Sequence, residues 1–156
     1  MTPDLQVLQA FLQTLTLVVL LIGLVGIGLI GAGFFITDPM NGYPPGTPLM
    51  PTVRSDHGKL HDLFGIPVFL GLPIACFVFG RWFARLGERG WAVYSILSGI
   101  AMFVFFVLAG MGFSQTPGFI DFAGIYQRLS LLFGLGWIAL LAFHSLRTPI
   151  NHGKET

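Results

Sequence analysis

Between Asp4 and Asp38 the chain carries no charged residue, and the part from Leu15 to Phe35 is almost entirely apolar. About 20 helical residues, at a rise of about 1.5 Å each, cross the hydrocarbon core of a bilayer. This run therefore predicts a membrane-spanning helix. Three further apolar runs follow it, and together they predict four spans over residues 15–36, 62–83, 91–113 and 125–146.

The composition excludes a water-soluble fold. Charged residues make up 10% of the chain and hydrophobic residues 54%, with a mean hydropathy of +0.79, whereas a soluble domain has about 25% charged residues. A net charge of +1 leaves no basic surface for nucleic acid. We expect an all-α, integral membrane four-helix bundle in a single domain, residues 1–156. Membrane lipids are its expected partners, and a small lipid-like ligand or a homo-oligomer stays open.

Lysines and arginines are unevenly divided between the two ends of the predicted spans. Three lie on the side of the long first connection, namely Arg54, Lys59 and Arg128. Five lie on the other side, namely Arg81, Arg85, Arg89, Arg147 and Lys154. Cytoplasmic loops of membrane proteins carry an excess of Lys and Arg. We therefore expect both termini in the cytoplasm and the long connection outside.

The first predicted span is rich in glycine. Small residues allow the backbones of two membrane helices to approach closely. We expect this region to pack against a neighbouring helix rather than against lipid, and a glycine-lined ligand path is the alternative. The packing residues are Gly26, Gly28, Gly31 and Gly33.

The connection from Thr37 to Asp62 contains five of the ten prolines, and Gly42 and Gly46 lie between them. Prolines and glycines in this pattern favour stiff turns, so we expect an ordered Pro/Gly-rich outer loop between the first two helices. Polar residues at the ends of this loop and at the start of the fourth span predict a cluster that binds a ligand or fixes the helix ends: Asp38, His57, His61, Asp62, Gln127 and Arg128.

Arg128 has a specific expected role in that cluster. It stands at the start of a helix, where the helix dipole disfavours a cation, and its guanidinium cannot lose its charge. It therefore needs an acceptor, and we expect it to pair with Asp38 or Asp62.

His57 and His61 are four residues apart. On a helix their imidazoles share one face, a spacing that can hold a metal ion, with Asp38 as a further ligand. A metal-assisted membrane enzyme at the outer face is therefore the alternative interpretation. The simpler one is that both imidazoles hydrogen bond to loop carbonyls and carboxylates. Because a full ligand set and a nucleophile–base set are both missing from the sequence, we expect no catalytic residue, no bound metal and no cofactor.

Four segments carry a family resemblance: GAGFFITDPMNGYPPGTP, HGKLHDLFGIPVFLGLPIACFVFGRWF, RGWAVYSILSG and GIYQRLSLLFGLGW. Together they resemble the bacterial membrane family catalogued as domain of unknown function 998. The resemblance implies a polytopic protein of the bacterial cytoplasmic membrane without an assigned activity. Members of that family are longer, so the chain looks like a short, about four-span form. We expect a non-enzymatic component that binds lipid or another small ligand, or that takes part in transport.

Overall fold

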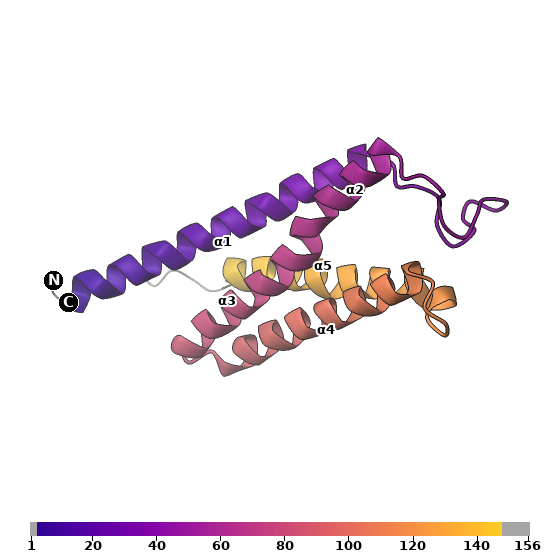
Figure 1. Ribbon diagram of the computed structural model, residues 1–156. Coiled ribbons are helices and arrows are strands. Elements are labelled where there is room, and N and C mark those ends of the chain that lie inside the picture. Colours follow the sequence, from indigo (N-terminus) through magenta and orange to yellow (C-terminus); the bar gives the residue numbers. More distant parts are fainter. Residues whose placement is uncertain (1–2, 148–156) are drawn as a thin grey trace.

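The computed structural model describes residues 3–147, and these form helices joined by loops (Figure 1). The long helices are α1 (Pro3–Phe34), α2 (Asp56–Ile66), α3 (Leu72–Arg85), α4 (Arg89–Phe113) and α5 (Ala123–Arg147). A π-helical segment, η1 (Pro67–Gly71), joins α2 to α3, and a short 3-10 segment, η2 (Ile120–Phe122), leads into α5. In this part of the chain there is no β-strand, which confirms the predicted all-α class.

Four stretches of the described residues are long and apolar enough to cross a membrane. They cover Thr16–Phe34, Asp56–Arg85, Arg89–Phe113 and Ile120–Arg147. Each overlaps one of the predicted spans, as a four-helix membrane bundle requires. The second helical run begins at Asp56, before the predicted membrane span, because the side chain of Ser55 caps the helix in the polar loop.

The second span is a continuous helical run in spite of its prolines. Pro67 and Pro73 lack the backbone N–H that an α-helix needs at these positions. The chain accommodates them with the π-helical turn η1, in which the backbone spacing is locally wider. The run therefore passes from α2 into α3 without a loop.

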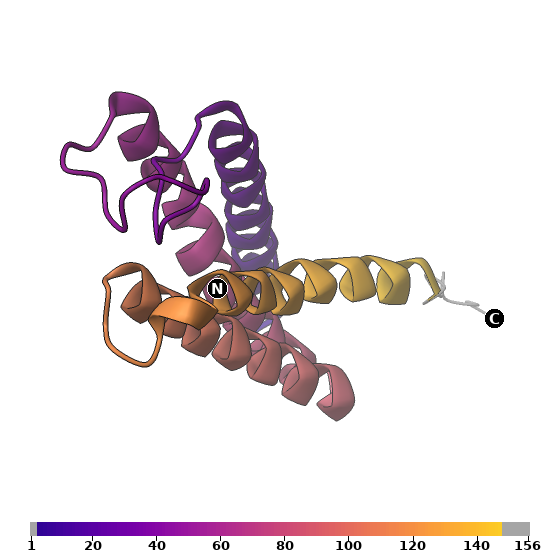
Figure 2. The same ribbon diagram turned by 90° about the vertical axis from the view of Figure 1, so that its right-hand side faces the viewer.

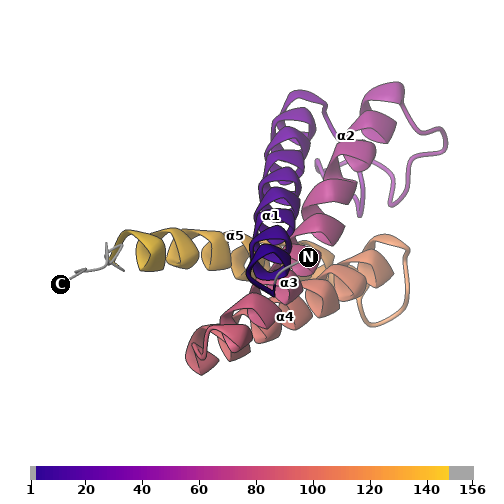
Figure 3. The same ribbon diagram turned by 90° about the vertical axis from the view of Figure 1, so that its left-hand side faces the viewer.

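Consecutive spans pack as antiparallel neighbours, with α3 along α4 as well as α4 along α5, and two of the pairs are open at one end. α1 lies beside α2 and η1 near the long loop and separates from α3 toward its own N-terminal end (Figure 1). α4 and α5 meet at the loop that joins them and spread apart toward Arg89 and Arg147 (Figures 2 and 3). The long loop lies at the same end of the molecule as the α4–α5 loop, because the Asn41 side chain donates a hydrogen bond to the carbonyl of Ile120 at 3.3 Å.

Two groups of buried side chains hold the bundle together. One joins α3, α4 and α5 around Trp137, which is fully buried. The other joins α1, η1, α3 and α4 around Leu72 and Met102. Buried polar groups in the core are satisfied, since Trp137 Nε1 donates to Ser95 Oγ at 3.0 Å and Ser130 Oγ donates to the Met102 carbonyl at 2.8 Å. Such interhelical hydrogen bonds replace part of the driving force that water supplies in soluble proteins.

The four glycines expected to pack together divide between two faces of α1. A Cβ at Gly28 would lie 2.7 Å from the Phe64 carbonyl oxygen, and one at Gly31 would overlap the Phe64 ring. At Gly26 and Gly33 nothing lies within 4 Å of the same position. The expectation for Gly26 and Gly33 therefore differs from the structure. At about 100° per residue, positions 28 and 31 share one face and positions 26 and 33 share the opposite one.

Candidate functional site

Asp38 is the centre of the polar cluster at the loop end of α1 and α2. Its carboxylate accepts a hydrogen bond from the Ser55 backbone N–H at 3.0 Å, and it is 9% exposed. Ser55 is the N-cap of α2, and its hydroxyl accepts from the Gly58 N–H at 2.9 Å. A side chain at Gly58 would overlap the Asp38 carboxylate. The first turn of α2 is thus docked onto the start of the loop that follows α1.

Arg54 lies between two carboxylates. Its Nε is 3.6 Å from Asp38 Oδ2, and its guanidinium forms an ion pair with Asp62. Asp62 comes from the second turn of α2, so Arg54 connects the loop to the helix as well as to Asp38. Both acids share one cation, which leaves this guanidinium little capacity for an external anion.

His61 closes the end of α1. Its Nδ1 is 2.9 Å from the carbonyl oxygens of both Ala32 and Phe35. Carbonyls in the last turn of a helix lack intrahelical donors. Because both neighbours are acceptors, the arrangement requires the proton on Nδ1. His57 is exposed and its ring makes an edge-to-face contact with that of Phe35, with ring centroids 5.6 Å apart.

The expected pairing of Arg128 with Asp38 or Asp62 is wrong. In residues 3–147 the cation within 4 Å of both acids is Arg54. Neither Gln127 nor Arg128 is joined to the cluster by a hydrogen bond or ion pair in this part of the chain, and Arg128 is exposed. The physical reason is connectivity, because the loop returns Arg54 directly to the start of α2, whereas Arg128 stands on α5 in the other helix pair.

Asp38 is held ionised by its neighbours. Hydrogen bonding by Ser55 lowers the pKa of the Asp38 carboxyl most, and the Arg54 guanidinium lowers it further, against the opposing effect of burial. A carboxyl with a lowered pKa in the folded state adds stability above its unfolded pKa of about 3.9. That stability is lost as the pH falls through the lower, folded pKa. We therefore expect the wild type to lose thermal stability below about pH 4, and Asp38→Asn to lose less in the same range.

Replacing Arg54 tests whether this cluster fastens the helix ends. Arg54→Gln should lower the melting temperature by about 2–4 °C, since it leaves a largely buried carboxylate without its cation. Lys59→Gln is the matched control, because Lys59 pairs with Asp56 at 2.9 Å in a strongly exposed position. Differential scanning of both variants in the same detergent gives the comparison. Equal melting temperatures would contradict a fastening role for Arg54.

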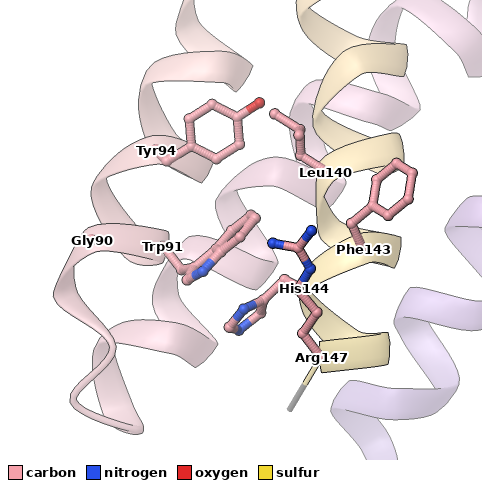
Figure 4. Close-up of a pocket in the computed structure, with 7 residues that line it drawn as sticks. All are labelled: Gly90, Trp91, Tyr94, Leu140, Phe143, His144 and Arg147. Carbon is pink, nitrogen blue, oxygen red and sulfur yellow. The ribbon is translucent and has the colours of Figure 1, made fainter.

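A second candidate site lies between α4 and α5 at their ends remote from the loop that joins them, where the two helices spread apart (Figure 4). It is a pocket of about 460 Å³, and its walls are mainly apolar and aromatic. The lining residues are Gly90, Trp91 and Tyr94 from α4 and Leu140, Phe143, His144 and Arg147 from α5.

His144 has a fixed position on the floor of this pocket. Its ring stacks on Trp91 with centroids 4.3 Å apart, and its Nε2 is 3.0 Å from Glu88 Oε2. Glu88 is the residue before α4, so this contact ties the α3–α4 turn to the end of α5. The guanidinium of Arg147 points from α5 into the space beside Trp91 and Phe143 (Figure 4).

Sequence reasoning missed the pocket. None of the candidate site residues derived from the sequence lines it. The available signal was that Trp91 opens the third span and His144 closes the fourth. In an antiparallel pair of consecutive helices such positions lie at the same depth.

The arrangement of the possible metal ligands in residues 3–147 gives little support for a metal site. Among residues 3–147 no group of three or more His, Cys, Asp or Glu side chains is placed to hold a metal ion. His61 directs Nδ1 at two carbonyls, and Asp38 directs its carboxylate at Ser55 and Arg54. The absence of a metal on His57 and His61 stays a prediction, for which elemental analysis of the purified protein is the measurement.

The family model described as protein of unknown function (DUF998) matches residues 9–144, which is most of the chain. The four candidate membrane helices fit a short, about four-span form of that family. No curated protein and no solved structure matches.

Proposed function

The chain belongs to the DUF998 family of proteins of unknown function, and we propose that it is a single-domain, non-enzymatic membrane protein that binds a small lipid-like ligand. The proposed site is the pocket between α4 and α5. The observation that carries the proposal is the composition of this pocket, in which apolar and aromatic walls surround Arg147 and His144. Ligand pockets of about 300–1,000 Å³ with a few placed polar groups are the usual form of small-molecule sites.

The position of the pocket favours a ligand with both an apolar and a polar part. It lies where two membrane helices diverge near the ends of their spans. Trp91 and Tyr94 are residue types that prefer the boundary between hydrocarbon and head groups. A lipid-like molecule could therefore place its chain against Leu140 and Phe143 and its polar part beside Arg147.

At the loop end of the bundle, the contacts within the polar cluster support a structural role for its side chains. Arg54 is shared by Asp38 and Asp62, and His61 serves two carbonyls of α1. Groups that already satisfy one another are poorly placed for catalysis or for recognition of a substrate. The metal-assisted enzyme that uses His57 and His61 is therefore the less supported alternative, and a transport role has no separate observation in its favour.

Filling the pocket should remove the ligand. Leu140→Trp places a large side chain on the pocket wall at a position that is 50% exposed, so the fold should tolerate it. The indole takes up volume that the ligand would fill, so we expect the occupancy of a bound lipid to fall about tenfold, or by about 1.4 kcal/mol of binding free energy. Native mass spectrometry of protein purified in mild detergent measures this occupancy.

The matched control for the filled pocket is Leu132→Trp. This residue is on the same helix, is 65% exposed and does not line the pocket. It should keep the lipid adduct of the wild type. A wild type with no adduct, or equal adducts in both variants, would contradict the proposed site.

We also propose that the protein lies in the bacterial cytoplasmic membrane with both termini in the cytoplasm. The support is the excess of Lys and Arg at the α3–α4 turn and the C-terminal tail. A phosphatase reporter inserted between Thr47 and Thr52 should be active, and the same reporter after Lys154 should be inactive. The reverse pattern would overturn the orientation.

A further inference from the structure

We infer that the ligand of the α4–α5 pocket is an anionic phospholipid, whose head group binds Arg147 and whose chain lies along the apolar walls. The inference rests on the proposed function and adds the charge class of the ligand. Three observations carry it: the distribution of paired cations in the molecule, the orientation of Arg147, and the position of Glu88.

The two ends of the bundle differ in how many of their cations pair with a carboxylate. At the loop end, Arg54 pairs with Asp38 and Asp62, and Lys59 pairs with Asp56, while Arg128 has no carboxylate of residues 3–147 within 4 Å. The pocket end carries four arginines, namely Arg81, Arg85, Arg89 and Arg147. None of them has a carboxylate of residues 3–147 within 4 Å. All four are exposed. This end therefore presents a positive surface that attracts anionic lipid head groups.

Arg147 is the arginine that also lines the pocket. Its guanidinium enters the space between α4 and α5 beside Trp91 and Phe143 (Figure 4). A guanidinium in such a place binds a phosphate group through two parallel hydrogen bonds, which a point charge cannot do. The phosphate of a lipid would then lie at the mouth of the pocket, with its glycerol and acyl chain directed toward Tyr94 and Leu140.

Glu88 is the carboxylate at the α3–α4 turn, and it is engaged with His144. Its Oε2 contacts His144 Nε2, on the side of His144 that faces the α3–α4 turn. It forms no ion pair with Arg147 within 4 Å. The acid fixes the floor of the pocket and leaves the guanidinium available to a phosphate.

The test is a titration with two lipids that have the same acyl chains. Phosphatidylglycerol is anionic and phosphatidylcholine is zwitterionic, and native mass spectrometry gives a dissociation constant for each. The wild type should bind phosphatidylglycerol about tenfold more tightly, because both lipids offer a phosphate to Arg147 but phosphatidylcholine also brings a cationic choline group into the positive surface at this end. Arg147→Gln should lose this preference, and Arg147→Lys should recover only part of it. Arg128→Gln removes an exposed arginine at the other end of α5 and should keep the preference.

The outcomes separate the inference from the proposed function. Equal binding of both lipids, lost in Leu140→Trp, would overturn the anionic assignment and leave the lipid pocket intact. Failure of both lipids to bind at the pocket would overturn both proposals. Excess inorganic phosphate should not displace phosphatidylglycerol, because the chain adds binding energy in the pocket. Binding of inorganic phosphate alone that depends on Arg147 and displaces the lipid would assign the site to free phosphate instead.

Discussion

Trp137→Ala should cost about 3–5 kcal/mol of unfolding free energy, the range for removing a large aromatic side chain from a packed core. Trp137 is fully buried, donates to Ser95 and makes an edge-to-face contact with Phe79, with ring centroids 5.3 Å apart. Its removal leaves a cavity where α3, α4 and α5 meet. The surrounding side chains then lose their contacts outright, because nothing of the right size replaces the indole.

The control for Trp137→Ala is Leu132→Ala on the same helix. Leu132 is 65% exposed in the isolated chain, so lipid fills its place, and its replacement should change stability by less than about 0.5 kcal/mol. Unfolding in mixed micelles of mild detergent and dodecyl sulfate measures both variants. Equal losses for the two would mean that α5 does not pack on α3 and α4 as described.

Gly28→Leu should destabilise the protein by about 1–3 kcal/mol through overpacking. A side chain at this position meets the Phe64 carbonyl at 2.7 Å and Pro67 Cγ at 2.9 Å. Backbone and proline atoms have little freedom to move, so α1 would have to separate from α2 and η1. The same unfolding assay gives the difference in free energy.

Gly26→Leu is the paired control for Gly28→Leu, because no atom lies within 4 Å of a Cβ built there. It should leave stability within about 0.5 kcal/mol of the wild type. Since both changes add the same side chain to the same helix, helix propensity cancels between them. A larger loss for Gly26→Leu than for Gly28→Leu would mean that the opposite face of α1 is the one that packs.

The helices could be predicted because bilayer thickness imposes a length on every apolar run. The absence of charge between Asp4 and Asp38 was sufficient for the first span. Hydropathy does not mark the helix ends, because α2 starts in the polar loop at Ser55, a preferred N-cap residue type whose hydroxyl accepts from the Gly58 N–H. Such a cap belongs to local geometry, and hydropathy does not record it.

Only part of the polar cluster could be predicted from the sequence. Asp38, His61 and Asp62 lie at the ends of consecutive helices, so the topology alone brings them to one end of the bundle. Their cation depended on the path of the loop. Arg54 precedes Asp62 by eight residues and meets it across the turn into α2, whereas hydropathy and helix dipoles pointed to Arg128.

Predicting the pocket would have required the angle at which α4 and α5 cross. Trp91 and His144 stack only because α4 and α5 bring their far ends within reach while leaving a gap beside Arg147 (Figure 4). The crossing angle follows from the side chains in contact along the whole pair, including Ser130 against Met102. No single motif in the sequence specifies it.

The most direct test of a lipid site in the pocket is photo-cross-linking in a bilayer. Phosphatidylglycerol and phosphatidylcholine, each with a diazirine on one acyl chain, would be supplied as a mixture, and the labelled peptides identified by mass spectrometry. Label should concentrate in residues 90–94 and 140–147 and fall about tenfold in both in Leu140→Trp. Label spread evenly over lipid-facing positions such as Ile30 and Leu132, and unchanged by Leu140→Trp, would contradict the account.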